Sequence, residues 1–435
     1  MTTATTVSHR DMPEDGIKDS RTNLPNRDSF YFDMRNWIEK GVDKSLVLLV
    51  VDIDGVEFVL KTFGPGERDT LLGQIGRTLQ GVSEPEGKLY YITQNRFTIV
   101  LSRGDYRQVK KYVQGCLSAL REPFEVAGIA YHVQAFVGIS HYPNHAKTIS
   151  ELVRTAVFAT HQARESEYNF ETFDLKSDEE SRFRFSLMLD LEHALEDQHG
   201  IRVAYQPQVD LKTNKCIGVE ALCRWNHSTI GEIPPGDFLP FVEQTPLMLP
   251  LTEAILSQGL QDLTTWRLKG FDGELAVNLS PSLFRLSRLL DRLLEHFRFS
   301  NMPMGNVHFE ITETGIMDQP NRAINLLSEM RRRGSRIAVD DFGTGHSSLA
   351  YLADLPIDII KIDKYFIQNL DKPWGRAIVG AASTLAEQLD LVTIAEGIET
   401  ESQLEKCKEL GVTVGQGFYL ARPMFAEDLE EWLGL

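Results

Sequence analysis

The chain has 435 residues, of which 42% are apolar and 25% charged, and its 62 acidic and 45 basic side chains give a formal net charge of −17. This acidic balance argues against a nonspecific binder of nucleic acid polymers or of anionic membrane surfaces, because both kinds of binding need basic patches. No apolar run is long enough for membrane insertion and no hydrophobic signal core precedes the first domain, so we expect a cytoplasmic protein.

Residues 1–20 are polar and without periodicity, which predicts a flexible tail. From residue 21 to about 173, apolar runs rich in Val and Leu alternate with segments of helical spacing, as in an α/β domain. The expected elements are a strand at 45–55, a helix at 68–82, a hairpin at 90–103 with its turn at Thr93–Arg96, a strand at 131–143 and a helix at 148–167.

The charged stretch "DLKSDEESRFRF" at 174–185 is predicted to be a linker between two domains. The next segment, "SLMLDLEHALEDQ", carries its apolar residues on one helical face. Its polar face is acidic, which favours an inter-domain connector or a barrel cover over a membrane-binding helix. A second domain is then expected from 186 to 435.

Within that second domain, short apolar runs recur, and each ends in a polar residue followed by helical sequence. Repeated strand-plus-helix units over about 250 residues are typical of a TIM-like (β/α)8 barrel, in which functional side chains gather where the strands end. The polar residues at the seven run ends are Glu220, Asn278, Glu310, Asp340 with Asp341, Lys361, Glu396 and Gln416.

Most of these side chains are oxygen donors, and none is a Cys or His, which favours Mg²⁺ or Mn²⁺ over softer metals. Adjacent Asp340 and Asp341 would allow one acid to bridge two ions, an arrangement suited to displacement at phosphorus. Lys361 would add a cation beside the reacting group. Taken singly, each acid could instead be a solvated loop carboxylate, Lys361 a salt bridge at the barrel rim, and Asn278 a turn cap.

The second domain resembles the EAL domain, the bacterial cyclic di-GMP phosphodiesterase module. The matching motifs run in order through the whole segment: "AYQPQVD", "VEALCRW", "VNLSP", "FEITET", "AVDDFGTGHSSLAYL", "IIKIDKYFI", "AEGIET" and "GQGFYLARP". The resemblance implies hydrolysis of one phosphodiester bond of cyclic di-GMP, giving linear pGpG, with two Mg²⁺ or Mn²⁺ ions per site and a homodimer formed through this domain.

The resemblance also implies a role for individual residues. One metal would be held by Glu220, Asn278, Glu310 and Asp340, and a second by Asp341 and Glu396 with Asp340 as the bridge. Catalysis would rest on Lys361, Glu396 and Glu220, with Lys361 orienting the attacking water. Substrate would be held by Gln206, Arg224, Asp363 and Gln416. Glu313, which strand alternation would turn away from Glu310, would brace the "DDFGTG" loop and link the metal site to the dimer interface.

The first domain resembles a GGDEF (diguanylate cyclase) domain, and "RTNLPNRDSF" matches its opening. The signature hairpin, however, reads "TQNRF", and Leu60 and Lys61 replace the Asn-Asp pair that reads guanine in the family. The inhibitory RxxD site would fall on "PEGK", Pro85–Lys88, which lacks both residues, although Asp52 is retained. We therefore expect a domain without cyclase activity that acts in regulation, dimerisation or docking of a regulatory protein partner.

Two alternatives to an active phosphodiesterase stay open. The barrel could be a receptor that binds cyclic di-GMP without cutting it, although such receptors normally lose a metal acid and none is missing here. The chain could instead be a regulatory interaction protein whose first domain carries the function, because an intact site can be silenced by its loop or by its dimer.

Overall fold

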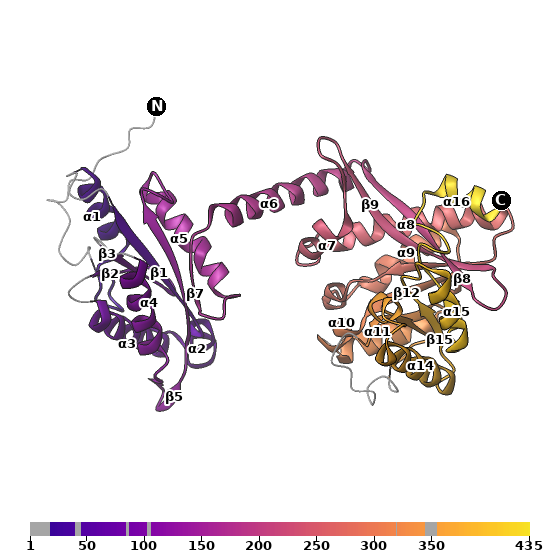
Figure 1. The fold of residues 1–435 in the computed structure, drawn as a ribbon. Coiled ribbons are helices and arrows are strands. Elements are labelled where there is room, and N and C mark those ends of the chain that lie inside the picture. The colour runs from indigo at the N-terminus through magenta and orange to yellow at the C-terminus, as the bar shows by residue number, and fades with distance from the viewer. Residues whose placement is uncertain (1–17, 40–44, 84–86, 102–105, 319, 344–354) are drawn as a thin grey trace. The chain divides into compact units, whose positions relative to one another are not determined.

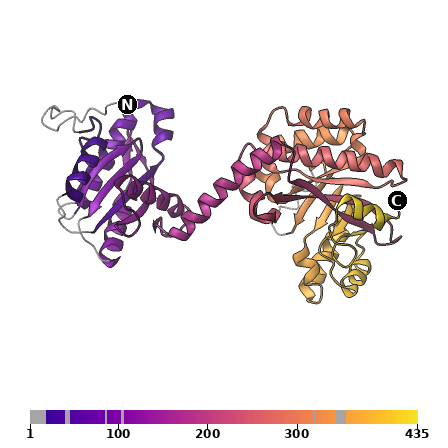
Figure 2. The same cartoon turned by 90° about the horizontal axis from the view of Figure 1, so that it is seen from above.

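The computed structural model describes residues 18–39, 45–83, 87–101, 106–318, 320–343 and 355–435, in two compact units, Met1–Arg182 and Phe183–Leu435 (Figures 1 and 2). The tail predicted for 1–20 falls mostly outside the described residues. Its end is structured, because Lys18 forms a β-bridge with Pro25 and the Asp19 N–H donates to the Leu24 carbonyl at 2.9 Å. The tail prediction is therefore wrong for these two residues.

The first unit is built on a five-stranded sheet in the order β2-β3-β1-β6-β7. Neighbouring strands are antiparallel except β6 and β7. The predicted hairpin is confirmed as β2 and β3. The strands are β1 (Leu46–Asp54), β2 (Gly87–Thr93), β3 (Arg96–Leu101), β6 (Gln134–Tyr142) and β7 (Phe170–Thr172), with a separate hairpin of β4 (Phe124–Val126) and β5 (Ile129–Tyr131).

Helices cover both faces of this sheet, because the central strand β1 buries its side chains on both sides. Val47, Leu49 and Val51 belong to one apolar cluster with α2 (Val56–Phe63), α3 (Pro65–Ser83) and α4 (Tyr106–Leu120). The alternate residues, including Leu48, pack with α1 (Arg27–Glu39) and α5 (Ile149–Ala163). The predicted α/β architecture of the first domain is thereby confirmed.

A single long helix, α6 (Leu175–Glu196), occupies the segment predicted as a linker. Its first turns are fixed to the first unit, because Arg154 donates two hydrogen bonds to the buried carboxylate of Asp178, at 2.8 and 3.0 Å. Arg182 adds a third donor to the same carboxylate at 3.1 Å. The charged composition of 174–185 therefore belongs to a helix with paired charges, and its assignment as the linker between the domains stays a prediction.

The second unit is an eight-stranded closed barrel, as predicted. Seven strands run parallel, and the first, β8, closes the barrel by pairing antiparallel with both β9 and β16. The strands are β8 (Ile201–Asp210), β9 (Cys216–His227), β11 (Glu274–Asn278), β12 (Val307–Thr312), β13 (Arg336–Phe342), β14 (Ile359–Ile362), β15 (Val392–Ala395) and β16 (Val414–Gly415), and β10 (Gly231–Ile233) extends β9. Among the described strands, the barrel differs from a regular (β/α)8 barrel at β8, which runs antiparallel and is joined to β9 as a hairpin.

Helices surround the barrel, and the main apolar core lies between them and the strands. They are α7 (Pro235–Val242), α8 (Met248–Leu268), α9 (Leu289–Ser300), α10 (Glu313–Asp318), α11 (Pro320–Arg332), α13 (Lys364–Gln368), α14 (Pro373–Gln388), α15 (Glu401–Glu409) and α16 (Ala426–Leu433), with short 3₁₀ turns at Pro281–Arg285 and Met304–Asn306. Within the described ranges, no helix is long and apolar enough to cross a membrane.

A small second cluster, formed by Ala338, Ile359, Ile394 and Val414, lies inside the barrel. Side chains of a strand alternate between its two faces, so the residue two positions further along points to the same side. Those next inward-facing residues are Asp340, Lys361, Glu396 and Gln416. We call the apolar cluster the barrel floor, since it lies directly below the predicted site.

Candidate active site

Lys361 lies at the centre of the predicted site, with only 1% of its side chain exposed. Its Nζ is 2.5 Å from Glu310 Oε2 and 2.7 Å from Glu396 Oε1. Asp340 Oδ2 and Glu220 Oε2 follow at 3.5 and 3.6 Å. Although burial alone would lower the pKa of Lys361, these four carboxylates raise it well above the usual value. The ammonium group is thus the internal counterion of the site and not a salt bridge at the rim.

Glu220 is held by amide donors. Asn278 Nδ2 donates to Glu220 Oε1 at 2.8 Å, and Gln416 Nε2 donates to Glu220 Oε2 at 2.6 Å. Gln416 also donates to Gln206 Oε1 at 3.1 Å, so residues from β8, β9, β11 and β16 form one network. Burial would raise the pKa of Glu220, but Lys361 and the two amides lower it, which keeps the carboxylate charged.

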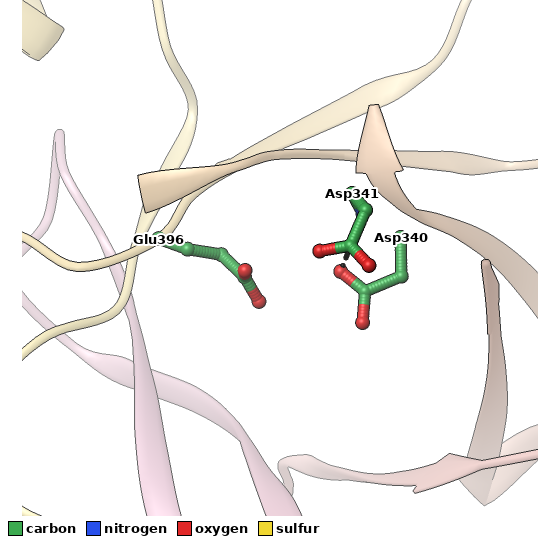
Figure 3. A group of neighbouring side chains, drawn as sticks. All are labelled: Asp340, Asp341 and Glu396. Carbon is green, nitrogen blue, oxygen red and sulfur yellow. Dashed lines mark hydrogen bonds between the residues drawn. The ribbon is translucent and has the colours of Figure 1, made fainter. Parts of the chain in front are cut away.

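A bulge in β13 brings the neighbouring acids Asp340 and Asp341 into one pocket. The pairing with β14 shifts register between Val339 and Phe342, and Asp341 takes a left-handed backbone conformation with φ +56°. Its N–H donates to Asp340 Oδ1 at 2.9 Å, and Glu396 points toward the pair from the opposite side (Figure 3). In a regular strand the two aspartates would face opposite sides of the sheet, and the bulge removes that constraint.

The chemistry of these donors fits divalent cations. Asp340, Asp341 and Glu396 each offer an oxygen, and these atoms all lie within 4.8 Å of one another. Burial, together with Asp340 and Asp363, raises the pKa of Asp341 to about 6. Burial also raises the pKa of Glu396 to about 8, with Asp340 and Glu220 adding to the shift and Lys361 opposing it. One ammonium group therefore does not neutralise five clustered carboxylates, and hard oxygen ligands in this number suit Mg²⁺ or Mn²⁺.

The residues predicted to hold substrate lie in different places. Gln206 joins the glutamine network, and Asp363 caps α13 by accepting from the Tyr365 N–H at 2.7 Å while also contacting Asp341. Arg224 has no contact with the acids among the described residues. Its Nη1 donates to its neighbour's carbonyl at 2.8 Å, and its closest carboxylate, on Glu232, is 3.9 Å away.

One cavity opens beside the acids. It measures about 320 Å³ and is lined by Gln206, Glu220, Lys364, Gln368, Glu396, Gly397, Glu399, Gln416, Gly417 and Phe418. A larger cavity of about 960 Å³ in the second unit is lined by 243–246, Leu249, 280–283, Arg285, Leu286, Thr312 and Gly315, and none of the predicted metal ligands is among these residues.

Glu313 is not in the strand, because β12 ends at Thr312 and Glu313 starts α10. The alternation argument for its direction is therefore wrong. Its buried carboxylate accepts a hydrogen bond from the Gly343 N–H at 3.1 Å, directly after β13. Gly343 is the last described residue before the gap at 344–354, so the remainder of the "DDFGTG" loop and its coupling to a dimer lie outside the described residues.

Two residues that touch the site were missed from the sequence. His308 is buried, with Nε2 3.4 Å from Glu310 Oε1 and Nδ1 3.4 Å from Glu274. Burial opposes protonation, but these two carboxylates raise the pKa of His308. Gln208 Nε2 donates to Glu310 Oε1 at 3.4 Å and to Gln416 Oε1 at 3.2 Å. Both lie two residues from a predicted site residue on the same strand, so the period of two could have found them.

In the first unit, the retained acid Asp52 is enclosed by the unit's own side chains. Asn95 Nδ2 donates to Asp52 Oδ1 at 2.8 Å, while Arg96 and Arg164 each approach Oδ2 at 3.3 Å. Arg164 also donates to Asp54 at 2.9 Å. Leu60 and Lys61 lie in α2, whereas Pro85 and Glu86 of "PEGK" lie outside the described residues.

Comparison with known protein families identifies both units. Residues 188–423 match the EAL domain family, and residues 17–169 match the family described as diguanylate cyclase, GGDEF domain. The EAL match covers more than half of the chain.

Individual relatives match nearly the whole of the chain. A cyclic di-GMP phosphodiesterase of Pseudomonas aeruginosa is 31% identical over 423 residues, which are 95% of this chain and 71% of the relative. The bifunctional diguanylate cyclase/cyclic di-GMP phosphodiesterase MucR of the same organism is 30% identical over 434 residues, covering 99% of this chain and 63% of MucR. Among solved structures, the PaMucR phosphodiesterase in complex with c-di-GMP is 39% identical, with a TM-score of 0.54, over 56% of this chain and 99% of that one.

Proposed function

Because the chain belongs to the EAL domain family and carries a GGDEF domain ahead of its barrel, we propose that the barrel hydrolyses cyclic di-GMP to linear pGpG by a two-metal mechanism. The observation that carries the proposal is the pocket itself: four carboxylates surround one buried lysine at the strand ends, and a fifth, on Asp341, lies beside two of them. A relative that shares 31% identity with this chain bears the name of a cyclic di-GMP phosphodiesterase.

Two Mg²⁺ or Mn²⁺ ions would supply Lewis-acid activation of water and neutralise charge on the phosphoryl oxygens. The amide-supported Glu220, with Asn278, Glu310 and Asp340, would hold one ion. Asp341 and Glu396 would hold the other, with Asp340 shared between them. The short separation of the Asp340, Asp341 and Glu396 oxygens supports this division.

Lys361 would have a role separate from that of the metal ions. Its Nζ lies 2.7 Å from Glu396, and 1% of the side chain is exposed. With the acids neutralised by bound metal, the Lys361 ammonium would stabilise negative charge that develops on the phosphoryl group. Lys361 and Glu396, together with Glu220, are therefore the residues to which we assign catalysis.

The ligand would lie across the barrel mouth. The cavity beside the acids, which Gln206 and Gln416 line, would hold part of the ligand. Arg224, which has no strong carboxylate partner, would bind a phosphate, and Asp363 would accept a hydrogen bond from the ligand or tune Asp341. The solved structure named above is a complex with c-di-GMP.

The first domain would make no cyclic di-GMP. Asn95 and two arginines occupy the lone pairs of Asp52 that a metal would need, and the glycines expected to approach a triphosphate are Thr93 and Gln94. Its proposed work is regulatory, through dimerisation or a protein partner, with the barrel forming a homodimer.

The test is turnover of cyclic di-GMP by the full-length protein with Mg²⁺ or Mn²⁺, with the product identified chromatographically. Glu220→Ala should abolish metal-dependent pGpG formation, whereas Glu405→Ala, which removes an exposed acid on α15, should leave it unchanged. If cyclic di-GMP binds and stays intact, the barrel is a receptor. If it neither binds nor is cut, the chain is an interaction protein and the proposal fails.

A further inference from the structure

His308 is a polar residue at a position that is small or apolar in the other parallel strands of the barrel. This position faces inward and lies two residues before the predicted site residue of each strand, which is Glu310 in β12. The residues at these positions in the other parallel strands are Gly218, Ala276, Ala338, Ile359, Ile394 and Val414. A buried imidazole in such surroundings is costly unless its nitrogens meet partners.

The imidazole meets one carboxylate on each side. Its exposed fraction is 2%, and each ring nitrogen lies 3.4 Å from a carboxylate oxygen, above on Glu310 and below on Glu274. Within the described residues neither ring nitrogen forms a hydrogen bond of good geometry, so the two carboxylates are ion-pair contacts of the imidazole. Glu274 is in turn held by Arg336 Nε at 3.0 Å. Glu310, His308, Glu274 and Arg336 thus form a continuous chain of polar contacts from the buried site to the partly exposed lower end of the barrel.

The two oxygens of Glu310 have different surroundings. Oε2 faces Lys361 at 2.5 Å, on the side of the other acids. Oε1 faces His308 at 3.4 Å and Gln208 at 3.4 Å, the two polar side chains below it. Gln208 fits there because its partner strand carries Gly218, where an added Cβ would lie 3.0 Å from Gln208 Oε1. Oε1 therefore meets the two side chains below, while Oε2 lies against Lys361 on the side of the other acids.

We propose that His308 is a positioning residue that, together with Gln208, fixes Glu310 Oε1 and so presents Oε2 to a divalent cation. The inference rests on the proposed function, because it takes Glu310 as a metal ligand. Partners that orient metal-binding carboxylates typically change metal affinity by roughly 10- to 100-fold when they are removed. A histidine that merely filled the barrel floor would affect folding stability and leave metal affinity unchanged.

The experiment is calorimetric titration of the full-length protein with Mn²⁺, without substrate, beside a thermal unfolding curve for each variant. His308→Phe should weaken Mn²⁺ binding by about 10- to 100-fold. His308→Gln should recover most of the affinity, because its amide can donate to Glu310. The control is Tyr205→Phe, which removes the hydrogen bond from an equally buried ring to the partly buried Asp262 and should lower the unfolding temperature without changing Mn²⁺ affinity.

Unchanged Mn²⁺ affinity in folded His308→Phe would overturn the inference and leave the proposed function standing. If that variant does not fold, Glu274→Gln, which removes the lower partner and keeps the imidazole, should still weaken Mn²⁺ binding several-fold, and an unchanged affinity there would overturn it. Absence of Mn²⁺ binding by the wild-type protein would overturn the metal mechanism and this inference together.

Discussion

Lys361 illustrates how one residue can prepare a metal site. A buried ammonium is normally expensive, and here four carboxylates raise its pKa and hold it charged. The same contacts keep the acids close together when no divalent ion neutralises them. Removing the lysine should therefore lower both the stability of the metal-free protein and the rate of catalysis.

Lys361→Met should lower turnover of cyclic di-GMP by roughly 100-fold or more, since it removes a cation from the phosphoryl group. Without divalent ions it should also lower the free energy of unfolding by about 3 kcal/mol, because the acids lose their counterion. Mn²⁺ should restore stability but not turnover. Thermal unfolding with EDTA or Mn²⁺ tests this, with Lys408→Met, a partly exposed lysine on α15, as the control. Full activity in Lys361→Met would contradict the assignment.

The raised pKa values of Asp341 and Glu396, about 6 and about 8, predict a pH dependence of stability. In the unfolded chain these carboxyls lose their protons near pH 4 to 4.5, as flexible acids do. Between that pH and about 8 the folded barrel binds more protons, so its free energy of unfolding should fall as the pH rises. The measurement is the unfolding temperature of the barrel in EDTA from pH 5 to 8.

Glu396→Gln should flatten the upper part of that curve, because the amide does not titrate. The first unit supplies an internal control, since burial lowers the pKa of His141 and His145, and its stability should rise over about pH 5 to 7. A barrel stability that rises with pH in EDTA would contradict the prediction.

At the scale of one element, β13 shows how a strand can deliver two neighbouring side chains to one site. The register shift between Val339 and Phe342 and the left-handed backbone of Asp341 do this together. Aspartate and asparagine tolerate that conformation better than most residues with a Cβ. The bulge therefore constrains the residue type at 341 even apart from its charge.

Asp341→Asn and Asp341→Ala form a matched pair for this element. Both remove the carboxylate, so both should weaken Mn²⁺ binding and turnover to a similar extent. Only Asp341→Ala should also lose about 1 kcal/mol of unfolding free energy, because alanine resists the left-handed conformation. Chemical denaturation in saturating EDTA measures the difference. Equal free energies of unfolding for the two variants would contradict the prediction, because they would mean that residue 341 can leave the left-handed conformation without cost.

At the scale of the whole molecule, the two units contain two contrasting acid sites. In the barrel, carboxylates outnumber the single buried lysine, whereas in the first unit Asp52 is matched by Arg96 and Arg164. A divalent ion should therefore stabilise one unit and leave the other unchanged. This asymmetry agrees with the proposal of an active barrel joined to a regulatory first domain.

Differential scanning calorimetry of the full chain should show two transitions, of which Mn²⁺ raises only the barrel's. At a concentration about 100 times the dissociation constant, the gain is about 2.7 kcal/mol. Mg²⁺ with GTP should leave the first unit's transition unchanged, and Arg96→Ala should not convert GTP to product. A shift of the first transition with either ligand would contradict the closed site around Asp52.

Much of the fold and of the site could be predicted from the sequence, because hydrophobic periodicity and the order of motifs do not depend on how the elements pack. The run ends Glu220, Glu310 and Lys361 were identified from strand patterns, and they do meet inside one barrel. The hairpin around Asn95 and Arg96 was predicted from two strand-like runs on either side of a polar turn. The replaced residues of its signature could also be read directly from the sequence. Family resemblance extended these patterns to an expected reaction, metal class and substrate.

The tertiary structure decided what depends on contacts between distant segments. The antiparallel β8, the helix through 174–185 and the start of α10 at Glu313 follow from pairing and packing, which local composition does not encode. The bulge at Asp341 and the position of His308 beneath Glu310 became visible only when strands far apart in the chain were brought together. The residue types of the site can thus be identified from short stretches of sequence. Their charge balance and the contacts that support them depend on strands that only the closed barrel brings together.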